Sequence, residues 1–245
     1  MKLLLTSLGV LVAAGTLWAQ SADEITAAAK KRADQGGYAW VSKTDSGANS
    51  QMRVGPTDGL VDKDGWALVK MTRGDNTTEM VVKGDKGAYK ADGDWKAIDT
   101  APQGGGGGGG GGQFDPGRMA ARNLRAFKLP TAEAIEMAAK CKDFKKDGDA
   151  ITATLSEDAV KALMSFGGRR GGPGGGGGGP EISDAKGTAK FWVKDGVLGK
   201  YEYHVQGKVN FNGNEREIDR TTTVELKDGA PAADAIPHSA KKLAS

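Results

Sequence analysis

The residues that could do chemistry are few and widely separated. The chain has two histidines, His204 and His238, and one cysteine, Cys141. Neither histidine has a Glu, a Cys or a second His at a spacing that would bind a metal on one face of a helix. His204 falls on the polar face of a predicted strand, so we expect a surface or cavity-rim side chain. A catalytic role for His204 would require two carboxylates close to it in the folded protein.

Cys141 follows an apolar helical pattern, and we expect it to end that helix as a small buried residue and not as a nucleophile. Because it is the only cysteine, no intrachain disulfide can form. The sequence has no Gly-x-Ser-x-Gly elbow, and no glycine-rich tract ends in the Gly-Lys-Ser/Thr of a phosphate-binding loop. These observations predict a protein that is not an enzyme and that needs no cofactor and no metal.

Three further patterns have a chemical alternative. The clusters Asp62-Lys63-Asp64-Gly65 and Asp92-Gly93-Asp94 resemble parts of a calcium loop, but neither supplies its full ligand set. The preference of Asp-Gly for hairpin turns explains both. Arg169-Arg170 lies among glycines and resembles an RNA-binding Arg-Gly segment, although a plain loop accounts for one isolated copy. With 34 basic and 31 acidic residues interspersed, the net charge of +3 predicts no nucleic-acid partner.

The N-terminus predicts export. Lys2 precedes an apolar run from Leu3 to Trp18, and small polar residues follow, as in a secretory signal peptide. The run is shorter than the ~20 apolar residues of a spanning helix. We expect cleavage after Ala19, with cleavage after Ser21 and an uncleaved anchor as alternatives. We therefore expect a signal peptide at 1–19 and one domain at 20–245. We expect the mature protein to be a monomer in the bacterial periplasm or secreted, and to have no stable membrane span after cleavage.

Two polyglycine tracts, Gly104–Gly112 and Gly167–Gly179, interrupt the patterned part of the chain. Glycine has no side chain to bury and loses the most backbone freedom on ordering, so we expect mobile loops at one end of the domain. Helices are predicted before and between the tracts: 22–35 capped by Asp23; one with Ala120, Leu124 and Phe127 ended by Pro130; one capped by Thr131 with Ile135, Ala138 and Ala139; and one capped by Ser156 with Val160, Leu163 and Met164.

The remaining segments predict strands joined by Asp-Gly and Asn-Gly turns, which favour antiparallel pairing. The predicted strands are Tyr38–Lys43, Gln51–Val54, Trp66–Thr72, Thr77–Lys83, Gly87–Lys90, Ala150–Leu155, Thr188–Lys194, Tyr201–Phe211 and a return strand after Asn212-Gly213. The pattern predicts an α+β domain in which helices cover one face of an antiparallel sheet. We expect burial of Tyr201, Tyr203, Val205, Phe211, Ile218, Val224, Leu124, Phe127, Ile135, Leu163 and Met164.

One phrase of the sequence carries a family resemblance. It reads Gly187-Thr-Ala-Lys-Phe-Trp-Val-Lys-Asp-Gly-Val-Leu-Gly-Lys-Tyr-Glu-Tyr, and a long hairpin ending in Thr221–Leu226 and a tail with Pro237 follow it. This is similar to the sheet of the LolA/LppX-like lipoprotein-carrier superfamily, and the order of elements agrees from about Ala22 to Ala240. The resemblance implies an unclosed, curved antiparallel half-barrel whose concave face is covered by helices and encloses an apolar cavity. Both polyglycine tracts depart from the family pattern.

The resemblance also implies a function: a non-catalytic cell-envelope protein that binds a lipid, an acyl chain or a lipoprotein between sheet and helices. The residues expected to line the cavity are Met119, Leu124, Phe127, Leu163, Met164 and Phe166. The alternative is that these side chains fill a solid core. A second hypothesis is a structural or adhesive envelope protein without a ligand, in which the glycine-rich loops contact partners.

Overall fold

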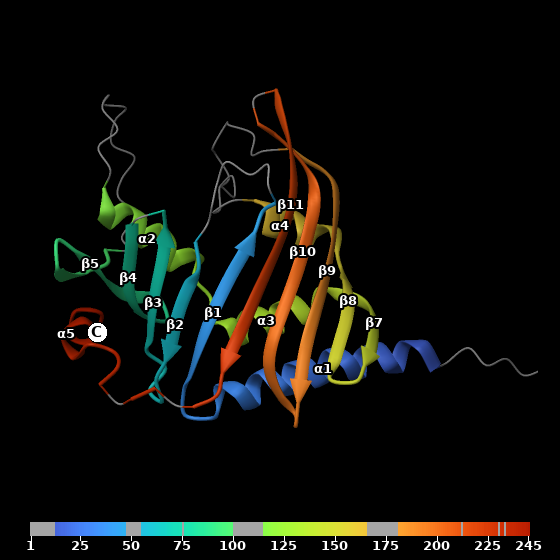
Figure 1. The fold of residues 1–245 in the computed structure, drawn as a ribbon, viewed down its shortest axis with the longest axis horizontal. Coiled ribbons are helices and arrows are strands. Elements are labelled where there is room, and N and C mark those ends of the chain that lie inside the picture. Colours follow the sequence, from blue (N-terminus) through green and yellow to red (C-terminus); the bar gives the residue numbers. More distant parts are fainter. Residues whose placement is uncertain are drawn as a thin grey trace, which may run out of the picture.

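A single open antiparallel sheet of eleven strands organises the described part of the chain (Figure 1). The computed structural model describes residues 13–47, 55–74, 76–99, 115–165, 181–211, 213–229, 231–232 and 234–245. Across the sheet the strand order is β6-β5-β4-β3-β2-β1-β11-β10-β9-β8-β7. Only the β1–β11 junction joins strands from opposite ends of the sequence, and all other neighbours are consecutive.

The strands are β1 (Tyr38–Asp45), β2 (Thr57–Val61), β3 (Ala67–Arg73), β4 (Asn76–Lys83), β5 (Lys86–Ala91), β6 (Asp94–Ala97), β7 (Cys141–Asp147), β8 (Ala150–Leu155), β9 (Glu181–Lys194), β10 (Val197–Phe211) and β11 (Asn214–Lys227). The helices are α1 (Ala13–Ala33), α2 (Pro116–Ala126), α3 (Pro130–Ala138), α4 (Glu157–Met164) and α5 (His238–Leu243). No helix among the described residues has the length and hydropathy needed to span a membrane.

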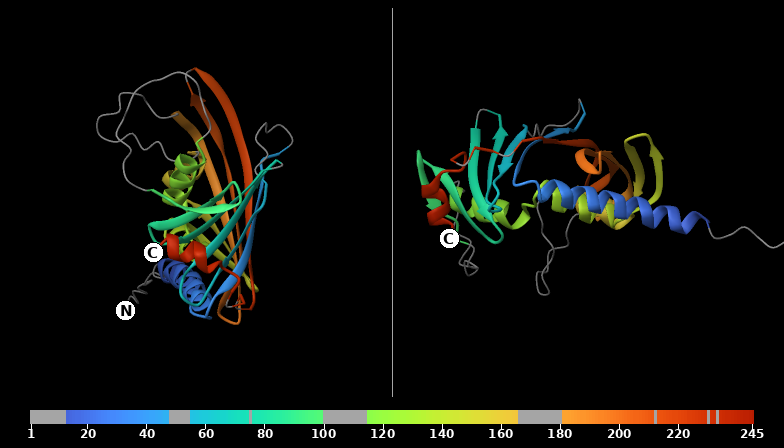
Figure 2. Two further views of the ribbon diagram at one scale, coloured as in Figure 1. Left: turned by 90° about the vertical axis from the view of Figure 1, so that its left-hand side faces the viewer. Right: turned by 90° about the horizontal axis from the view of Figure 1, so that it is seen from below.

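The predicted α+β class and the curved, unclosed sheet are confirmed, and helices cover the concave face (Figure 2). Alternate residues of each strand point into this face, and they join apolar residues of α1 to α4 in one core. Of the side chains expected to be buried, Tyr201, Tyr203, Val205, Val224, Leu124 and Met164 are buried, while Phe127, Ile135, Leu163 and Ile218 are half-buried against the core. The side chain of Phe211, the strand at Gln51–Val54 and both polyglycine tracts lie outside the described residues.

Several helix boundaries differ from the prediction. Helix α1 begins at Ala13 and passes through Asp23, because Ala and Leu continue the helical pattern on the N-terminal side of the expected cap. Helix α3 begins with Pro130 at its first turn, so Thr131 lies inside the helix and does not cap it. Ser156 caps α4 as predicted and accepts a hydrogen bond from the Ala159 N–H.

Four elements were not predicted: β2, β6, β7 and α5. The predicted helix end at Cys141 is wrong, because Cys141 opens the edge strand β7. The Asp58-Gly59 pair, a combination that favours turns, lies inside β2. A Cβ on Gly59 would lie 2.0 Å from a ring carbon of Trp40, so the glycine gives space for the indole on the neighbouring strand.

A second, smaller core lies on the opposite, convex face of β2 to β5. Leu68, Val81 and Ala88 point away from the main core, and the C-terminal residues Ile236 and Ala240 cover them. This arrangement agrees with the sequence around Trp66–Thr72, where both sets of alternating residues are partly apolar. Helix α5 and the residues before it therefore cover the convex face at one end of the sheet only.

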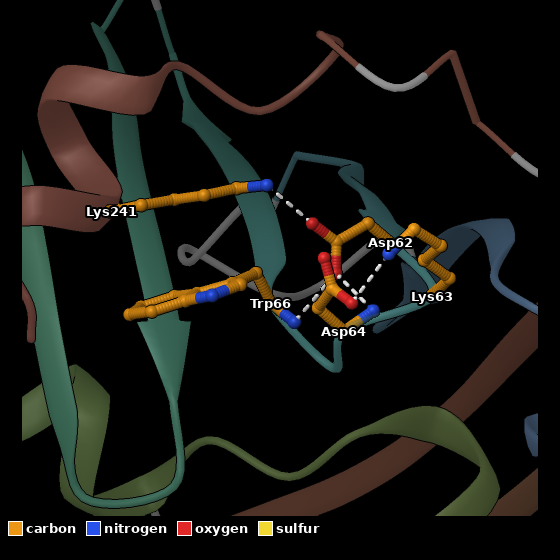
Figure 3. Close-up of polar contacts among 5 residues, drawn as sticks. All are labelled: Asp62, Lys63, Asp64, Trp66 and Lys241. Atoms are coloured by element: carbon orange, nitrogen blue, oxygen red, sulfur yellow. Dashed lines mark hydrogen bonds and ion pairs between the residues drawn. The ribbon is translucent and has the colours of Figure 1, made fainter.

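Figure 3 shows the ion pair that holds α5 in place. The Lys241 ammonium lies 2.5 Å from Oδ2 of Asp62, and the two side chains are only 17% and 9% exposed. Oδ1 of Asp62 accepts hydrogen bonds from the backbone N–H groups of Asp64 and Trp66, each at 2.9 Å. Asp62-Lys63-Asp64-Gly65 is thus the β2–β3 hairpin turn expected from its Asp-Gly pair.

Candidate ligand-binding site

Aromatic side chains form the centre of the concave face beside the α2–α3 junction. Trp40 is 3% exposed and lies between Tyr38 and Phe127, with ring centroids 6.1 and 6.3 Å apart respectively. Phe127 ends α2 and stays half-buried, so one side of this aromatic group remains open to solvent. Tilted rings at these distances pack favourably beyond the area that they bury.

On the other side of the concave face, glycines allow α4 to pack closely on β9 and β10. A Cβ on Gly187 would lie 2.9 Å from a methyl of Val160, and a Cβ on Gly207 would lie 2.8 Å from the terminal methyl of Met164. Both separations are shorter than ordinary carbon contacts, so a larger residue would push the helix away. The two glycines thereby fix the depth of α4 above the sheet.

The residues expected to line a cavity fall into two groups on two helices. Leu124 on α2 and Met164 on α4 are 5% and 1% exposed and pack directly over glycine positions of the sheet. Met119, Phe127 and Leu163 are half-buried. Phe166 lies outside the described residues. Two of the six side chains, Leu124 and Met164, therefore fill the layer between sheet and helices, and Phe127 and Leu163 lie at its accessible edge.

Polar groups inside the layer were not predicted from the sequence. The Tyr201 hydroxyl donates a 2.5 Å hydrogen bond to Oε2 of Glu133 on α3, and the Tyr38 hydroxyl lies 3.1 Å from Oγ1 of Thr131 on the same helix. Burial raises the pKa of the Glu133 carboxyl, although the hydrogen bond from Tyr201 opposes the shift. Burial likewise raises the pKa values of Tyr201 and Tyr38, so both phenols stay protonated and join α3 to the sheet.

A row of hydroxyl groups crosses the three adjacent strands β1, β11 and β10. Thr44 on β1 lies opposite Thr222 on β11, and their Oγ1 atoms are 3.1 Å apart. Thr222 lies opposite Tyr203 on β10 and forms a side-chain hydrogen bond with it. Thr222 is 5% exposed and Tyr203 is 9% exposed, whereas Thr44 is half-buried. We call Thr44, Thr222 and Tyr203 the hydroxyl row.

Arg220 adjoins the hydroxyl row on β11. It lies opposite the buried Val205, and its guanidinium donates a 2.5 Å hydrogen bond to the backbone carbonyl of Leu163 near the end of α4. Burial lowers the pKa of Arg220, and the nearby Tyr203 opposes this shift. Because an arginine side chain retains its charge under all ordinary conditions, this position brings a cation into a mainly apolar layer.

The alternation of β11 contained a signal for these residues. Burial was predicted for Ile218 and Val224, and a period of two places Arg220 and Thr222 on the same face of the strand. Polar residues within an otherwise apolar face mark a position where the core is interrupted. The sequence gives no comparable signal for Glu133. It lies in the first turn of α3, where acidic residues are common in any helix.

The other groups considered for chemistry lie away from this layer or are inert. His204 is on the polar convex face, and its Nε2 lies 2.7 Å from Oδ1 of Asp219, whose Oδ2 accepts a hydrogen bond from Gln206. Burial raises the pKa of Cys141 to about 12, so its thiol is not a nucleophile near neutral pH. Within the described ranges, no three His, Cys, Asp or Glu side chains are grouped as they would be around a metal ion.

Comparison with known proteins gives structural matches only. No family model and no curated protein matches the chain. The lipoprotein LppX of Mycobacterium tuberculosis is 12% identical with a TM-score of 0.45, and the match covers 85% of this chain and 94% of LppX. LprF of Mycobacterium bovis is 13% identical with a TM-score of 0.46, covering 91% of this chain and 98% of LprF.

Proposed function

We propose that this chain is an exported, non-catalytic protein of the bacterial cell envelope that binds a lipid or acyl chain between the concave face and helices α1 to α4. The observation that carries the proposal is the continuous apolar layer on that face, with Phe127 and Leu163 half-buried at its edge. Partly exposed apolar side chains beside a buried apolar layer are typical of sites for apolar ligands. The signal-peptide pattern at 1–19 supports export of a single domain at 20–245.

The direct test is native mass spectrometry of the protein purified from the periplasm, followed by delipidation. We expect a co-purified acyl-chain compound and a lower melting temperature after its removal, because a ligand that binds only the folded state stabilises it. A matched pair of variants adds a site-specific arm. Phe127→Ser at the open aromatic group should reduce lipid occupancy, whereas Trp192→Ser on the convex face should not. Protein that carries no lipid and melts unchanged after delipidation would contradict the proposal.

One observation favours the second hypothesis, a structural or adhesive envelope protein without a ligand. Leu124 and Met164 already fill their part of the layer against the sheet. In that case the glycine-rich loops would contact partners, and the concave face would bury only side chains of the core and no ligand. Shortening Gly104–Gly112 and Gly167–Gly179 separates the two functions. Loss of envelope association with no lipid bound before or after the change supports the scaffold, and unchanged lipid uptake supports the carrier.

A further inference from the structure

We propose that the convex side of β7 to β10 binds the anionic surface of a membrane. Trp192 and the lysines around it make the contact, and we call this group the lysine face: Trp192 with Lys142, Lys145, Lys190, Lys194 and Lys200. This contact goes beyond the proposed function, because it determines where the protein lies in the envelope and not what the concave face holds. Loss of the contact should therefore leave the equilibrium lipid occupancy unchanged.

Trp192 lies at the centre of the lysine face. Its neighbours on β9, Phe191 and Val193, are buried in the concave core, so the indole points to the convex side. The ammonium of Lys190 lies 4.9 Å from the centroid of the Trp192 ring, and that of Lys200 lies 4.6 Å from it. All three side chains are half-buried. An indole with cations beside it suits the boundary between charged head groups and acyl chains.

A bulge in the edge strand β7 brings two more lysines to the same side. Lys142 lies opposite Thr154 and Lys145 lies opposite Thr152 on β8, and the register shifts between them. Asp143, inside the shift, has a φ of 56°. Because a bulge adds a residue and turns the side chains that follow, lysines three positions apart point to one face. The alternate residues of β8 are buried in the concave core, so that face is the convex one, and both lysines are exposed on it.

Positive charge dominates the lysine face. Lys194 is exposed at the end of β9 on the same side of the strand. The register places the carboxyl groups of Asp147 and Glu202 in the same rows of the sheet as the lysines. Glu202 lies opposite Lys190 but accepts a hydrogen bond from the Thr223 hydroxyl, and within the described residues the structure records no ion pair between Glu202 and Lys190. The face as a whole therefore attracts anions.

The form of this surface favours a membrane over a protein partner. Helices α1 to α4 pack on the concave side and α5 lies on β4 to β6, so the described helices leave the lysine face uncovered (Figure 2). Between the lysines of β7 and β9, β8 contributes the small side chains of Ala150, Thr152 and Thr154. Lysines spread over strands about 4.8 Å apart suit mobile phosphate head groups, whereas the core of a protein interface is closely packed and poor in lysine.

Acidic residues on β11 set the orientation. Glu217, Asp219 and Glu225 are exposed on the convex side of β11, next to β10. An anionic surface repels these carboxylates and attracts the lysines, so the membrane meets the β7 side of the sheet, where Lys142 and Lys145 lie.

The experiment measures co-sedimentation of the protein purified from the periplasm with lipid vesicles. One set is pure phosphatidylcholine, and the other contains about one third phosphatidylglycerol. We expect binding to the anionic vesicles alone, weakened when NaCl rises from about 50 to about 200 mM. Lys190→Gln/Lys200→Gln should weaken this binding at least about tenfold, because each lysine near an anionic surface adds to the attraction. The control is Lys86→Gln/Lys242→Gln, which removes the same charge from exposed positions on β5 and α5 and should change binding less than about twofold.

A variant that strengthens binding keeps folding defects apart from the loss of contacts. Glu202→Gln removes a negative charge from the lysine face and keeps an acceptor for the Thr223 hydroxyl, so it should bind anionic vesicles at least about twofold more tightly with an unchanged melting temperature. Absence of binding to anionic vesicles, equal binding to both vesicle types, or equal losses for the two lysine pairs would overturn the membrane contact. Lysine-dependent binding to soluble polyglutamate without vesicle binding would assign the face to an acidic protein and overturn it as well.

Discussion

Two carboxyl groups on opposite faces of the sheet have pKa values shifted in opposite directions. Burial raises the pKa of Glu133 on the concave side. Burial also acts to raise the pKa of Asp62 on the convex side, but hydrogen bonds from Lys241 and from the Trp66 and Asp64 N–H groups outweigh it and lower that pKa. Each shift makes folding depend on pH, and the two dependences have opposite signs.

Replacing Glu133 by Gln should reduce the loss of stability as pH rises. The folded state keeps the Glu133 proton above the unfolded pKa of about 4.3, so this group stabilises the fold most at acidic pH, and that stability is lost as pH rises through the raised folded pKa. Glutamine does not titrate and can still accept the Tyr201 hydrogen bond. Urea unfolding between pH 4 and 8 should give a flatter profile for Glu133→Gln than for wild type. Glu136→Gln on the same helix is the control, and identical profiles for the two variants would refute the assignment.

Replacing Asp62 by Asn should destabilise the protein at neutral pH by about 3 kcal/mol, because the Lys241 ammonium, only 17% exposed, loses its partner. Asparagine retains an acceptor for the turn N–H groups, so the change isolates the ion pair. The pKa of Asp62 is lowered, hence its contribution is present above the unfolded value of about 3.9 and is lost as pH falls through the folded one. The exposed Asp64→Asn should cost less than about 1 kcal/mol. Chemical denaturation at pH 7 measures both, and equal costs would contradict the role given to Asp62.

At the scale of elements, long periodic segments were predictable and short edge segments were not. The alternation in β10 and β11 and the spacing in α2 and α4 identify those elements from local pattern alone. Strand β7 has one half-buried aromatic, Phe144, among charged residues, and β6 has four residues, so neither shows a clear period. Tertiary contacts determine the structure of such segments. In β2, for example, the indole of Trp40 packs against Gly59, and the Asp58-Gly59 pair lies in a strand.

The candidate site was predictable in its apolar part only. The helix stripes identified Leu124, Phe127, Leu163 and Met164 as residues that face the sheet. The hydroxyl row depends on which strands become neighbours, and Thr44 meets Thr222 across 178 positions of sequence. Local periodicity cannot specify that register, because the β1–β11 pairing is fixed by the whole sheet.

Adding a methyl group at Gly59 should disrupt the packing of β1 on β2. The Cβ of Gly59→Ala would lie 2.0 Å from the Trp40 ring, so the indole must move or the strands must separate, at a cost of about 1–3 kcal/mol. Tryptophan fluorescence should shift at the same time. Gly199→Ala in β10 is the matched control, since no atom lies within 4 Å of the added carbon. Equal stability of the two variants in urea denaturation would contradict the packing of Trp40 against Gly59.

At the scale of the molecule, one sheet serves two cores that do not share side chains. Helices α1 to α4 bury the concave residues, and α5 with the preceding C-terminal residues buries the convex surface of β3 to β5. Among the described residues, the two clusters of buried side chains are separate and lie on opposite faces of the same strands. A change in the C-terminal contacts should therefore leave the packing of the concave core intact.

The double variant Asp62→Asn/Glu133→Gln tests this separation. Distant sites without shared partners contribute additively, so the double variant should differ from the sum of the single effects by less than about 0.5 kcal/mol at pH 7. Denaturant unfolding of the four proteins gives the coupling energy. A coupling above about 1 kcal/mol would show that the sheet transmits strain between its faces.

The position of β1 beside β11 has a consequence for the order in which the protein folds. Arg32 at the end of α1 pairs with Asp228, 196 positions later, so the first and last parts of the sheet meet only when nearly the whole chain is available. Contacts of such long sequence separation slow folding, because the loop entropy is lost before the contacts form. A chain with this topology cannot complete its sheet while its C-terminal strand is still on the ribosome.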